Sequence, residues 1–476
     1  MTNLTLTSYN PATGEIVWQG PVASEKEMQS AILAARQAFS EWQFTPFDKR
    51  VSHLESFREA LASMEDEVAE MISKEIGKPL WESKEEIKSV LNKVALSIES
   101  YRERCPEKIQ DHPLGQAILN HKPHGVVAVL GPFNFPVHIP YGHIIPALLA
   151  GNTVIFKPSE FTPRTAELVM KAWEKSGIPL GVIQMIQGGR EAGRVITSHA
   201  EVDGIFFTGN WETGIAFSEY VVKNPGKILA LEMGGNNPLV ISNNIANIEA
   251  AVHTTVLSAY LTSGQRCSCA RRLIILEGVQ GDAFLQALVE AVKAIHVGPY
   301  TENPEPFMGP VISPAAAAHL LTVQEMLQKR GGISLVEMHL MQVDTSLISP
   351  GLIDVTTMNA HFDEEVFGPL LRVTRVKNLE EAITEANNTT FGLTAGILSD
   401  KAEEYEMFYR AIKAGIINWN TPLTNASSAL PFGGIKKSGN YRPSAYYAAD
   451  YCSYPVASII SPQVRTCLHH GVKTGS

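Results

Sequence analysis

The 476-residue chain is poor in cysteine, in long apolar runs and in positive charge, and each shortage excludes a class of protein. Five cysteines at irregular spacing do not make a disulfide framework and indicate a reducing compartment. No stretch approaches the roughly 18 uninterrupted apolar residues that a membrane span needs. The opening residues, MTNLTLTSYNP, lack the basic start and apolar run of a secretory signal. We therefore expect a cytoplasmic protein without a membrane segment.

The formal net charge of −10 argues against a general nucleic-acid-binding protein, because neutralising phosphates requires clustered Lys and Arg. Hydrophobic residues make up 45% of the chain and charged residues 18%, which is typical of a folded protein. The length exceeds what a single core supports, so two or three domains are expected.

The hydrophobic pattern changes near residue 125. Before it, amphipathic patterns predict helices over 25–42, 50–76 and 81–101. After it, short apolar runs alternate with helical patterns: GVVAVLG, NTVIFKP, GVIQMIQ, DGIFFTG and KILALEM, then RRLIILEG, GLIDVTT, LLRVTRV and GLTAGIL. Strands that alternate with helices predict mostly parallel sheets. The sequence thus predicts two α/β lobes, with the loop that contains Cys267 near their junction.

Two segments could bind a dinucleotide. IFFTGNWETG, at 205–214, places a strand, a glycine turn and a helix start, where backbone N–H groups can receive a phosphate. IFKPSE follows another strand, so Lys157 and Glu160 could bind a ribose, and the carboxylate would repel a 2′-phosphate and favour NAD over NADP. The alternatives are an ordinary strand-to-helix turn, and a solvated turn before a helix that begins at Pro163.

Three other residues are candidates for chemistry. Asn134 of GPFNFP, in a proline-bounded loop, could donate to a developing oxyanion, or could simply form a turn. Glu232 of LEMGGNNP follows an apolar strand and could be a general base with a raised pKa, or a buried carboxylate paired with a cation. Cys267 lies on a loop beside Arg266, which could lower its pKa and make it a nucleophilic thiolate.

The pair Cys267 and Cys269 does not suit the other roles of cysteine. A disulfide between them would be strained and is not expected in a reducing compartment. Zinc needs about four ligands, and no second Cys or His pair lies at usable spacing, so we expect no metal. Inert core thiols and a nucleophile both remain possible readings, and Cys269, nearer the strand RRLII, is the better candidate for packing.

Seven motifs occur in a characteristic order: GPFNFP, FKPSE, FFTG, LEMGG, GQRC, EEVFGP and PFGGIKKSG. In this order the chain resembles the NAD(P)-dependent aldehyde dehydrogenase superfamily over nearly its whole length. The resemblance implies an α/β fold with a Rossmann-like cofactor domain (1–104 and 124–232), an α/β catalytic domain (233–440) and a small β oligomerisation arm with the C-terminal segment (105–123 and 441–476). It also implies a homodimer or a dimer of dimers.

The resemblance carries roles to matching residues. Cys267 matches the nucleophile, Glu232 the general base and Asn134 the oxyanion donor. The positions that match cofactor contacts are Lys157 and Glu160 for the ribose, Gly209, Asn210, Trp211, Glu212, Thr213 and Gly214 for the pyrophosphate turn, and Glu365 and Phe367 for the nicotinamide side. The sequence departs from the family at Asn210, usually Ser, at Asn236, usually Lys, and at Tyr441, usually Gly. An N-terminal strand reading like INGxW is also missing.

Longer segments, among them SGQRCSCARRL and GNYRPSAYYAADYCSYP, resemble a branch that acts in arginine catabolism on an aldehyde bearing two carboxylates. We therefore expect a small acidic aldehyde as substrate and cations or donors around it. The candidates are Arg266, Arg442, Lys437, His138 and His143. The alternatives are another carboxylated semialdehyde, or a non-catalytic structural homologue, which would have no need to keep Cys267, Glu232 and Asn134.

Overall fold

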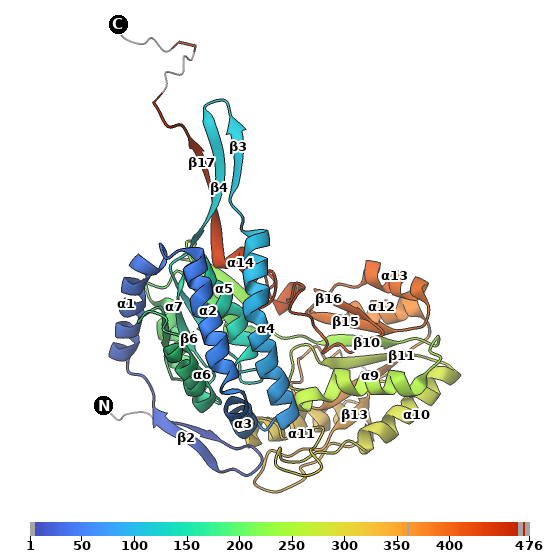
Figure 1. Ribbon diagram of the computed structural model, residues 1–476. Coiled ribbons are helices and arrows are strands. Elements are labelled where there is room, and N and C mark those ends of the chain that lie inside the picture. The colour runs from blue at the N-terminus through green and yellow to red at the C-terminus, as the bar shows by residue number, and fades with distance from the viewer. Residues whose placement is uncertain (1–4, 359–360, 465–469, 472–476) are drawn as a thin grey trace.

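The computed structural model describes residues 5–358, 361–464 and 470–471. Two α/β lobes lie side by side, and a narrow β arm projects from them (Figure 1). None of the helices in these residues combines the length and apolar character needed to cross a bilayer.

The first lobe is built on a five-stranded parallel sheet in the order β7-β6-β5-β8-β9. Its strands are β5 (Val126–Leu130), β6 (Thr153–Lys157), β7 (Ile183–Met185), β8 (Gly204–Thr208) and β9 (Ile228–Glu232). Every residue of β5, β6 and β8 is buried, because helices cover both faces of the sheet. Burial on both faces explains why these strands appear in the sequence as continuous apolar runs.

Helices that precede this sheet in the chain and helices that connect its strands both cover it. They are α1 (Glu25–Trp42), α2 (Phe47–Ala62), α3 (Glu65–Ile76), α4 (Leu80–Arg104), α5 (His138–Ala150), α6 (Pro163–Lys175), α7 (Arg190–Ser198) and α8 (Trp211–Val222). Apolar side chains of α2 to α6 form one core, and those of α1, α7 and α8 form another on the opposite face. The single helix predicted over 50–76 is wrong: Met64 leaves helical geometry and is buried in the first core, which separates α2 from α3.

The second lobe holds a seven-stranded sheet in the order β12-β13-β14-β11-β10-β15-β16, parallel except where β12 joins β13. Its strands are β10 (Asn237–Ile241), β11 (Ala270–Leu276), β12 (Ile333–Val336), β13 (Gly351–Asp354), β14 (Leu370–Val376), β15 (Thr394–Leu398) and β16 (Ile416–Trp419). Helices α9 (Ile248–Tyr260) and α10 (Val279–Lys293) pack into one core of this lobe, and α12 (Leu379–Asn387) and α13 (Ala402–Ala411) into a second. Helix α11 (Pro314–Lys329) contributes to a further core beside β13.

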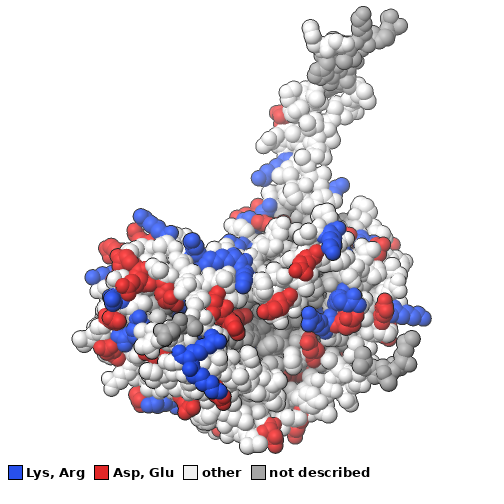
Figure 2. Space-filling view, turned by 180° about the vertical axis from the view of Figure 1, so that it is seen from behind, with Lys and Arg blue, Asp and Glu red and all other residues white. Residues whose placement is uncertain are grey.

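The arm is a three-stranded antiparallel sheet in the order β17-β4-β3. It joins β3 (Lys108–His112) and β4 (Gly115–Pro123) to β17 (Ser453–Ile460), which follows the short helix α14 (Ala448–Cys452). Figure 2 shows that acidic and basic side chains are spread over the lobes, whereas the visible surface of the arm is mostly uncharged. Near the N-terminus of the described residues, β1 (Thr5–Tyr9) and β2 (Ile16–Pro21) pair as a hairpin of their own, and neither has an INGxW-like sequence.

A buried carboxylate joins α4 to α5. One oxygen of Glu86, on α4, accepts the backbone N–H groups of Val137 (2.9 Å) and His138 (3.0 Å), where α5 begins. The other accepts the Lys78 ammonium at 2.7 Å, and both side chains are almost fully buried. The N-cap residue of α5 makes no side-chain hydrogen bond to the helix, so Glu86, which lies on α4, caps it instead.

We expect Glu86→Ala to lower the free energy of unfolding by about 3 kcal/mol, because it leaves the Lys78 charge and two N–H groups buried without partners. Chemical denaturation followed by tryptophan fluorescence measures this loss. The matched control is Glu85→Ala, whose exposed carboxylate bonds only Lys88 and should change stability by less than about 0.5 kcal/mol. Equal losses in the two variants would contradict the capping role.

Candidate active site

The loop that carries Cys267 joins α9 to β11 and has an unusual backbone. Thr262 and Ser263 adopt left-handed conformations, with φ of 53° and 56°, which cost free energy for residues with a side chain. Hydrogen bonds hold them there: the Thr262 hydroxyl donates to Glu82 at 2.9 Å and the Ser263 hydroxyl to the Gly309 carbonyl at 2.7 Å. Residues outside the loop, Glu82 and Gly309, therefore help to hold its backbone in this conformation.

The two cysteines of this loop face different surroundings. The side-chain amide of Asn237 donates to the carbonyls of Cys267 (2.7 Å) and Cys269 (2.8 Å) and so fixes the backbone of both. Cys269 is fully buried, with its sulfur 3.8 Å from the Leu261 carbonyl oxygen. Cys267 is half-buried and lines a pocket. Of the two thiols, Cys267 is the one that a bound molecule can meet.

Asn134 lies against the same loop. Its side chain is buried, and its amide nitrogen donates to the Gln265 carbonyl at 2.8 Å, two residues before Cys267. An amide NH₂ group has two N–H bonds, so the contact with Gln265 orients Asn134 and leaves a second donor. The structure thus brings Asn134 close to Cys267, although the two residues are 133 positions apart in the chain.

Glu232 ends β9, and its carboxyl group lies close enough to Cys267 for its charge to affect the thiol. Burial raises its pKa to about 7, although a hydrogen bond with the Cys267 side chain offsets part of that effect. One of its oxygens, Oε1, is buried without a partner in the described residues. A carboxyl group with a pKa near neutrality can both accept and release a proton under ordinary conditions.

The Cys267 thiol does not have the lowered pKa that its position next to Arg266 predicts. Burial raises its pKa well above the usual value, and the nearby charge of Glu232 raises it further. Arg266 does not oppose this, because its guanidinium binds the Glu82 carboxylate and the Thr262 hydroxyl. Cys267 is therefore protonated at rest, and its activation needs a base.

Glu365 and Phe367 approach the site from the segment before β14. Glu365 accepts the Gly235 N–H at 3.1 Å, and burial raises its pKa to about 7. Gly234 has a φ of +69°, and a Cβ there would lie 2.1 Å from a Glu365 oxygen, so glycine is required on both grounds. The Phe367 ring stands edge-on to Phe133, with centroids 5.9 Å apart.

The residues expected to bind an adenosine ribose lie at the end of β6. The buried Lys157 ammonium donates to the carbonyls of Pro158 and Gly188, both at 2.8 Å. Its distance to the Glu160 carboxylate, 3.8 Å, is too long for a hydrogen bond. Because an ammonium has three N–H bonds, one donor of Lys157 can still reach a ligand hydroxyl beside Glu160.

The turn over 209–214 begins α8. Asn210 caps this helix, its side-chain oxygen accepting the Thr213 N–H at 2.9 Å. Gly214 is needed for packing inside the protein, since a Cβ there would lie 2.1 Å from the Met233 sulfur, and Gly209 lies against the Phe207 ring. Trp211 lies under the Lys437 ammonium, 4.4 Å from its ring centroid, and Glu212 adds an acidic side chain to the first turn.

A pocket of about 350 Å³ opens beside Cys267. It runs along α4 and is closed by the Cys267 loop, the start of α5 and the C-terminal loops. Its lining residues are Trp81, Glu82, Glu85, Glu86, Ser89, Lys93, Phe135, His138, Ile139, Arg266, Cys267, Ser268, Thr424, Asn425, Ala426, Ser427, Ser428, Phe432, Ser444 and Ala445. Within the described chain, no cluster of three or more His, Cys, Asp or Glu side chains is placed to hold a metal ion.

Two of the five residues expected around the substrate, Arg266 and His138, line this pocket. Burial lowers the pKa of His138 well below its usual value, so it is neutral. His143 is outside the pocket: residues five apart on a helix point about 140° away from each other, and its ring is fully buried against the Tyr451 hydroxyl at 2.8 Å. The expectation that His143 contacts the substrate is therefore wrong.

Lys437 and Arg442 also lie elsewhere. Lys437 covers Trp211 on the α8 side, and Arg442 donates to the Gly434 carbonyl at 2.7 Å, within its own loop. Sequence reasoning instead missed Lys93, a buried lysine that lines the pocket from α4. The signal for it was the helical spacing of Glu82, Glu86 and Lys93, which puts all three on one side of α4.

Comparison with known proteins identifies the family. Residues 2–455 match the sequence model of the aldehyde dehydrogenase family. The chain belongs to the aldehyde dehydrogenase family. It is 51% identical, over 459 residues covering 96% of this chain and 93% of the relative, to an N-succinylglutamate 5-semialdehyde dehydrogenase of Pseudomonas fluorescens (strain Pf0-1).

Solved structures of the family confirm the fold class. A 1-pyrroline-5-carboxylate dehydrogenase from Thermus with bound NAD superposes with a TM-score of 0.90 at 28% identity, covering 96% of this chain and 90% of that one. An E. coli NADP dependent enzyme also superposes with a TM-score of 0.90 at 28% identity, covering 96% of this chain and 94% of that one.

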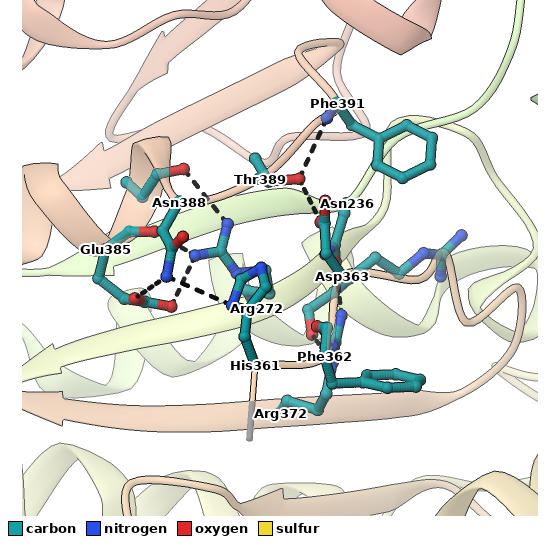
Figure 3. A network of polar contacts seen from close by, with 12 residues as sticks. Asn236, Arg272, His361, Phe362, Asp363, Arg372, Glu385, Asn388, Thr389 and Phe391 are labelled. Atoms are coloured by element: carbon teal, nitrogen blue, oxygen red, sulfur yellow. Dashed lines mark hydrogen bonds and ion pairs between the residues drawn. The ribbon is translucent and has the colours of Figure 1, made fainter. Parts of the chain in front are cut away.

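Asn236, which stands where the aldehyde dehydrogenase family usually has lysine, is part of a polar network (Figure 3). Its amide donates to Asp363 at 2.8 Å, and its oxygen accepts from the buried Arg372. Burial would raise the pKa of Asp363, but hydrogen bonds from Thr389, Thr390 and Asn236 lower it to about 2. This permanently charged carboxylate anchors the segment that leads into Glu365.

The raised pKa of Cys267 predicts how its alkylation depends on pH. Labelling by iodoacetamide should reach half its maximal rate at a higher pH than for free cysteine, because burial and Glu232 disfavour the thiolate. In Glu232→Gln the midpoint should fall, since a negative charge is removed. Mass spectrometry measures the label, with Cys267→Ser as the control for its position. A wild-type midpoint below that of free cysteine would contradict the assignment of a protonated thiol.

Proposed function

We propose that this aldehyde dehydrogenase oxidises N-succinyl-L-glutamate 5-semialdehyde to N-succinyl-L-glutamate with NAD, in arginine catabolism. The observation that carries the proposal is the position of the Cys267 thiol, which lines the pocket, close to the buried carboxyl group of Glu232, whose pKa burial raises to about 7. The extended similarity to an N-succinylglutamate 5-semialdehyde dehydrogenase supports the substrate.

Cys267 is the proposed nucleophile. Its thiol transfers a proton to Glu232, whose pKa near 7 suits it to accept one, and the sulfur attacks the aldehyde carbon. The remaining N–H of Asn134 and the backbone N–H of Cys267 stabilise the oxyanion that forms. NAD, when bound, supplies the acceptor for the hydride that leaves this adduct. Once Glu232 has released this first proton to solvent, it takes a proton from a water molecule. The oxygen of that water attacks the thioester carbon, the bond from this carbon to the Cys267 sulfur breaks, and the acid leaves while Cys267 returns to the thiolate.

The residues at the end of β6 and the start of α8 fit a dinucleotide. The free donor of Lys157 and the carboxylate of Glu160 suit a ribose with two hydroxyl groups, and the N-terminus of α8 suits a pyrophosphate. Asn210 already occupies the Thr213 N–H, so the pyrophosphate would use the other N–H groups of this helix turn. Glu365 and Phe367 would border the nicotinamide, near Glu232.

The arm is the proposed oligomerisation surface, in a homodimer or a dimer of dimers in the cytoplasm. Apolar side chains of Ile109, Ile459 and Ile460 are 55%, 58% and 46% exposed on its strands, although these strands belong to an otherwise ordered sheet. Exposed β-branched residues on a sheet with few charges are what an interface between copies would cover.

The proposal is tested by NADH absorbance with a panel of aldehydes. N-succinylglutamate semialdehyde should give a higher kcat/KM than succinate semialdehyde, glutamate semialdehyde or hexanal. Cys267→Ala should abolish oxidation, whereas Cys269→Ala, which alters a thiol packed on the Leu261 carbonyl, should keep most of it. Hexanal matching the acidic aldehyde would contradict the substrate, and greater damage from Cys269→Ala would contradict the nucleophile.

The cofactor preference is a separate prediction. NAD should be preferred over NADP by at least about tenfold in kcat/KM, roughly 1.4 kcal/mol, because Glu160 would face the 2′-phosphate. Glu160→Gln should narrow this ratio, while Glu174→Gln, which removes an exposed charge from α6, should leave it unchanged. Equal specificity constants for the two cofactors in the wild type would show that Glu160 is not placed against the ribose.

A further inference from the structure

The charged side chains that line the pocket are paired, with one exception. Glu82 binds Arg266, Glu86 binds Lys78, and Glu85 binds Lys88 outside the pocket. Lys93 is 4% exposed, and its ammonium donates to the Ser444 carbonyl at 2.9 Å. Among the described residues no carboxylate lies within ion-pair distance of it. Lys93 is thus the one lining cation whose charge the described protein does not balance.

Burying an ammonium with a single neutral partner is costly, because the charge loses its hydration and two N–H bonds remain unused. A buried titratable group of this kind in a pocket is a candidate for a functional site, and a ligand of opposite charge would supply the partner that Lys93 lacks among the described residues. If Lys93 served only to hold the Ser444 carbonyl, a neutral hydrogen-bond donor would be enough and a charge would not be needed. The cation therefore points to an anion that enters the pocket.

The position of Lys93 along α4 indicates which anionic group of a ligand it can reach. Glu82, which binds the loop of Cys267 through Arg266 and Thr262, lies eleven residues before Lys93 on α4, a rise of about 16 Å. Side chains lean toward the N-terminus of a helix, which brings the ammonium nearer to the Cys267 end than the rise alone. The Lys93 ammonium is therefore placed to bind a group of the ligand that lies some distance from the reacting aldehyde carbon.

The proposed substrate has carboxylates at two distances. The glutamyl carboxylate is close to the aldehyde, whereas the succinyl carboxylate is eight bonds away, about 10 Å in an extended chain. Ser428 lines both the main pocket and a small cavity of about 10 Å³ that it shares with Lys93 and Ser444, so it supplies a hydroxyl donor at the same end. Resting on the function proposed above, we propose that Lys93 binds the succinyl carboxylate of the substrate and makes the enzyme specific for that end of the molecule.

The test compares two substrates that differ only at this end: N-succinyl- and N-butanoyl-glutamate 5-semialdehyde, the second carrying a methyl group in place of the far carboxylate. The ratio of their kcat/KM values in the wild type should be roughly ten- to hundredfold in favour of the succinyl compound. In Lys93→Met this ratio should collapse to within about threefold of one. Because both substrates share the aldehyde and the glutamyl carboxylate, effects on Cys267 and Glu232 cancel in the ratio.

Lys84→Met is the matched control, since it removes a lysine of α4 that binds Asp66 on the outer surface, and it should keep the wild-type ratio. If Lys93 only holds the Ser444 loop, Lys93→Met would lower kcat/KM for both substrates alike and keep the ratio, which would overturn the proposal. The proposed function fails in a different way: the wild type would then not prefer the succinyl compound in the aldehyde panel.

A second measurement uses the wild type and so does not depend on how a variant folds. Burial lowers the pKa of Lys93 to about 7, so its charge is present below that pH and is lost above it. The titratable groups around it are Glu86 on its own helix, held by Lys78, the neutral His138 and His143 of α5, and Arg266 on the Cys267 loop. Titration of these protein groups affects the kcat/KM of both substrates alike and cancels in their ratio. The succinyl to butanoyl ratio should therefore fall between pH 6 and pH 10, and a constant ratio over this range would overturn the proposal.

Discussion

One stripe of buried charges on α4 determines the shape of the pocket. Residues at these helical spacings lie on the same side of a helix, and each charge holds a different distant segment. Glu82 binds the Cys267 loop, Glu86 caps α5, and Lys93 binds the C-terminal loop at Ser444. The walls of the pocket come from residues that are hundreds of positions apart, and this helix fixes their places relative to one another.

Burial also controls the chemistry. Cys267, Glu232 and Glu365 lie close enough together that a negative charge on any of them disfavours a charge on the others. The resting site therefore retains its protons. Reactivity in such a site depends on where a proton moves when an aldehyde arrives, and a carboxyl group with a pKa near 7 can exchange one without a large cost.

The sequence predicted the family, the α/β fold and most strands, because strands buried on both faces are unbroken apolar runs. Within the two lobe sheets it did not predict β10, whose Asn-Pro start comes shortly after two glycines and resembles a turn, or β12 and β16, which have four residues each. It did not predict the hairpin strands β1 and β2 either. The prediction of a low pKa at Cys267 assumed a free Arg266, but the partner of Arg266 is Glu82, 184 positions away. Local patterns contain no information about such pairings.

The same limit explains Lys93. Charged residues on a long helix usually face water, and the helical spacing that puts Lys93 on the side of Glu82 and Glu86 does not show that this side is buried. Its burial follows from contact with Ser444, 351 positions later. Likewise, the closeness of His143 to Asn134 in the sequence suggested a place in the site, but the turn of α5 directs that ring into the core.

The pairing of β17 with β4 has a consequence for biosynthesis. A ribosome completes β3 and β4 before most of both lobes, yet β17, which pairs with the other side of β4, emerges only after the strands of both lobe sheets. Until then one edge of β4 has no partner, and unpaired edges invite pairing with other nascent chains. Ser444 and Ala445 of the pocket wall arrive equally late, so the first lobe can fold while the protein is still unable to enclose a substrate.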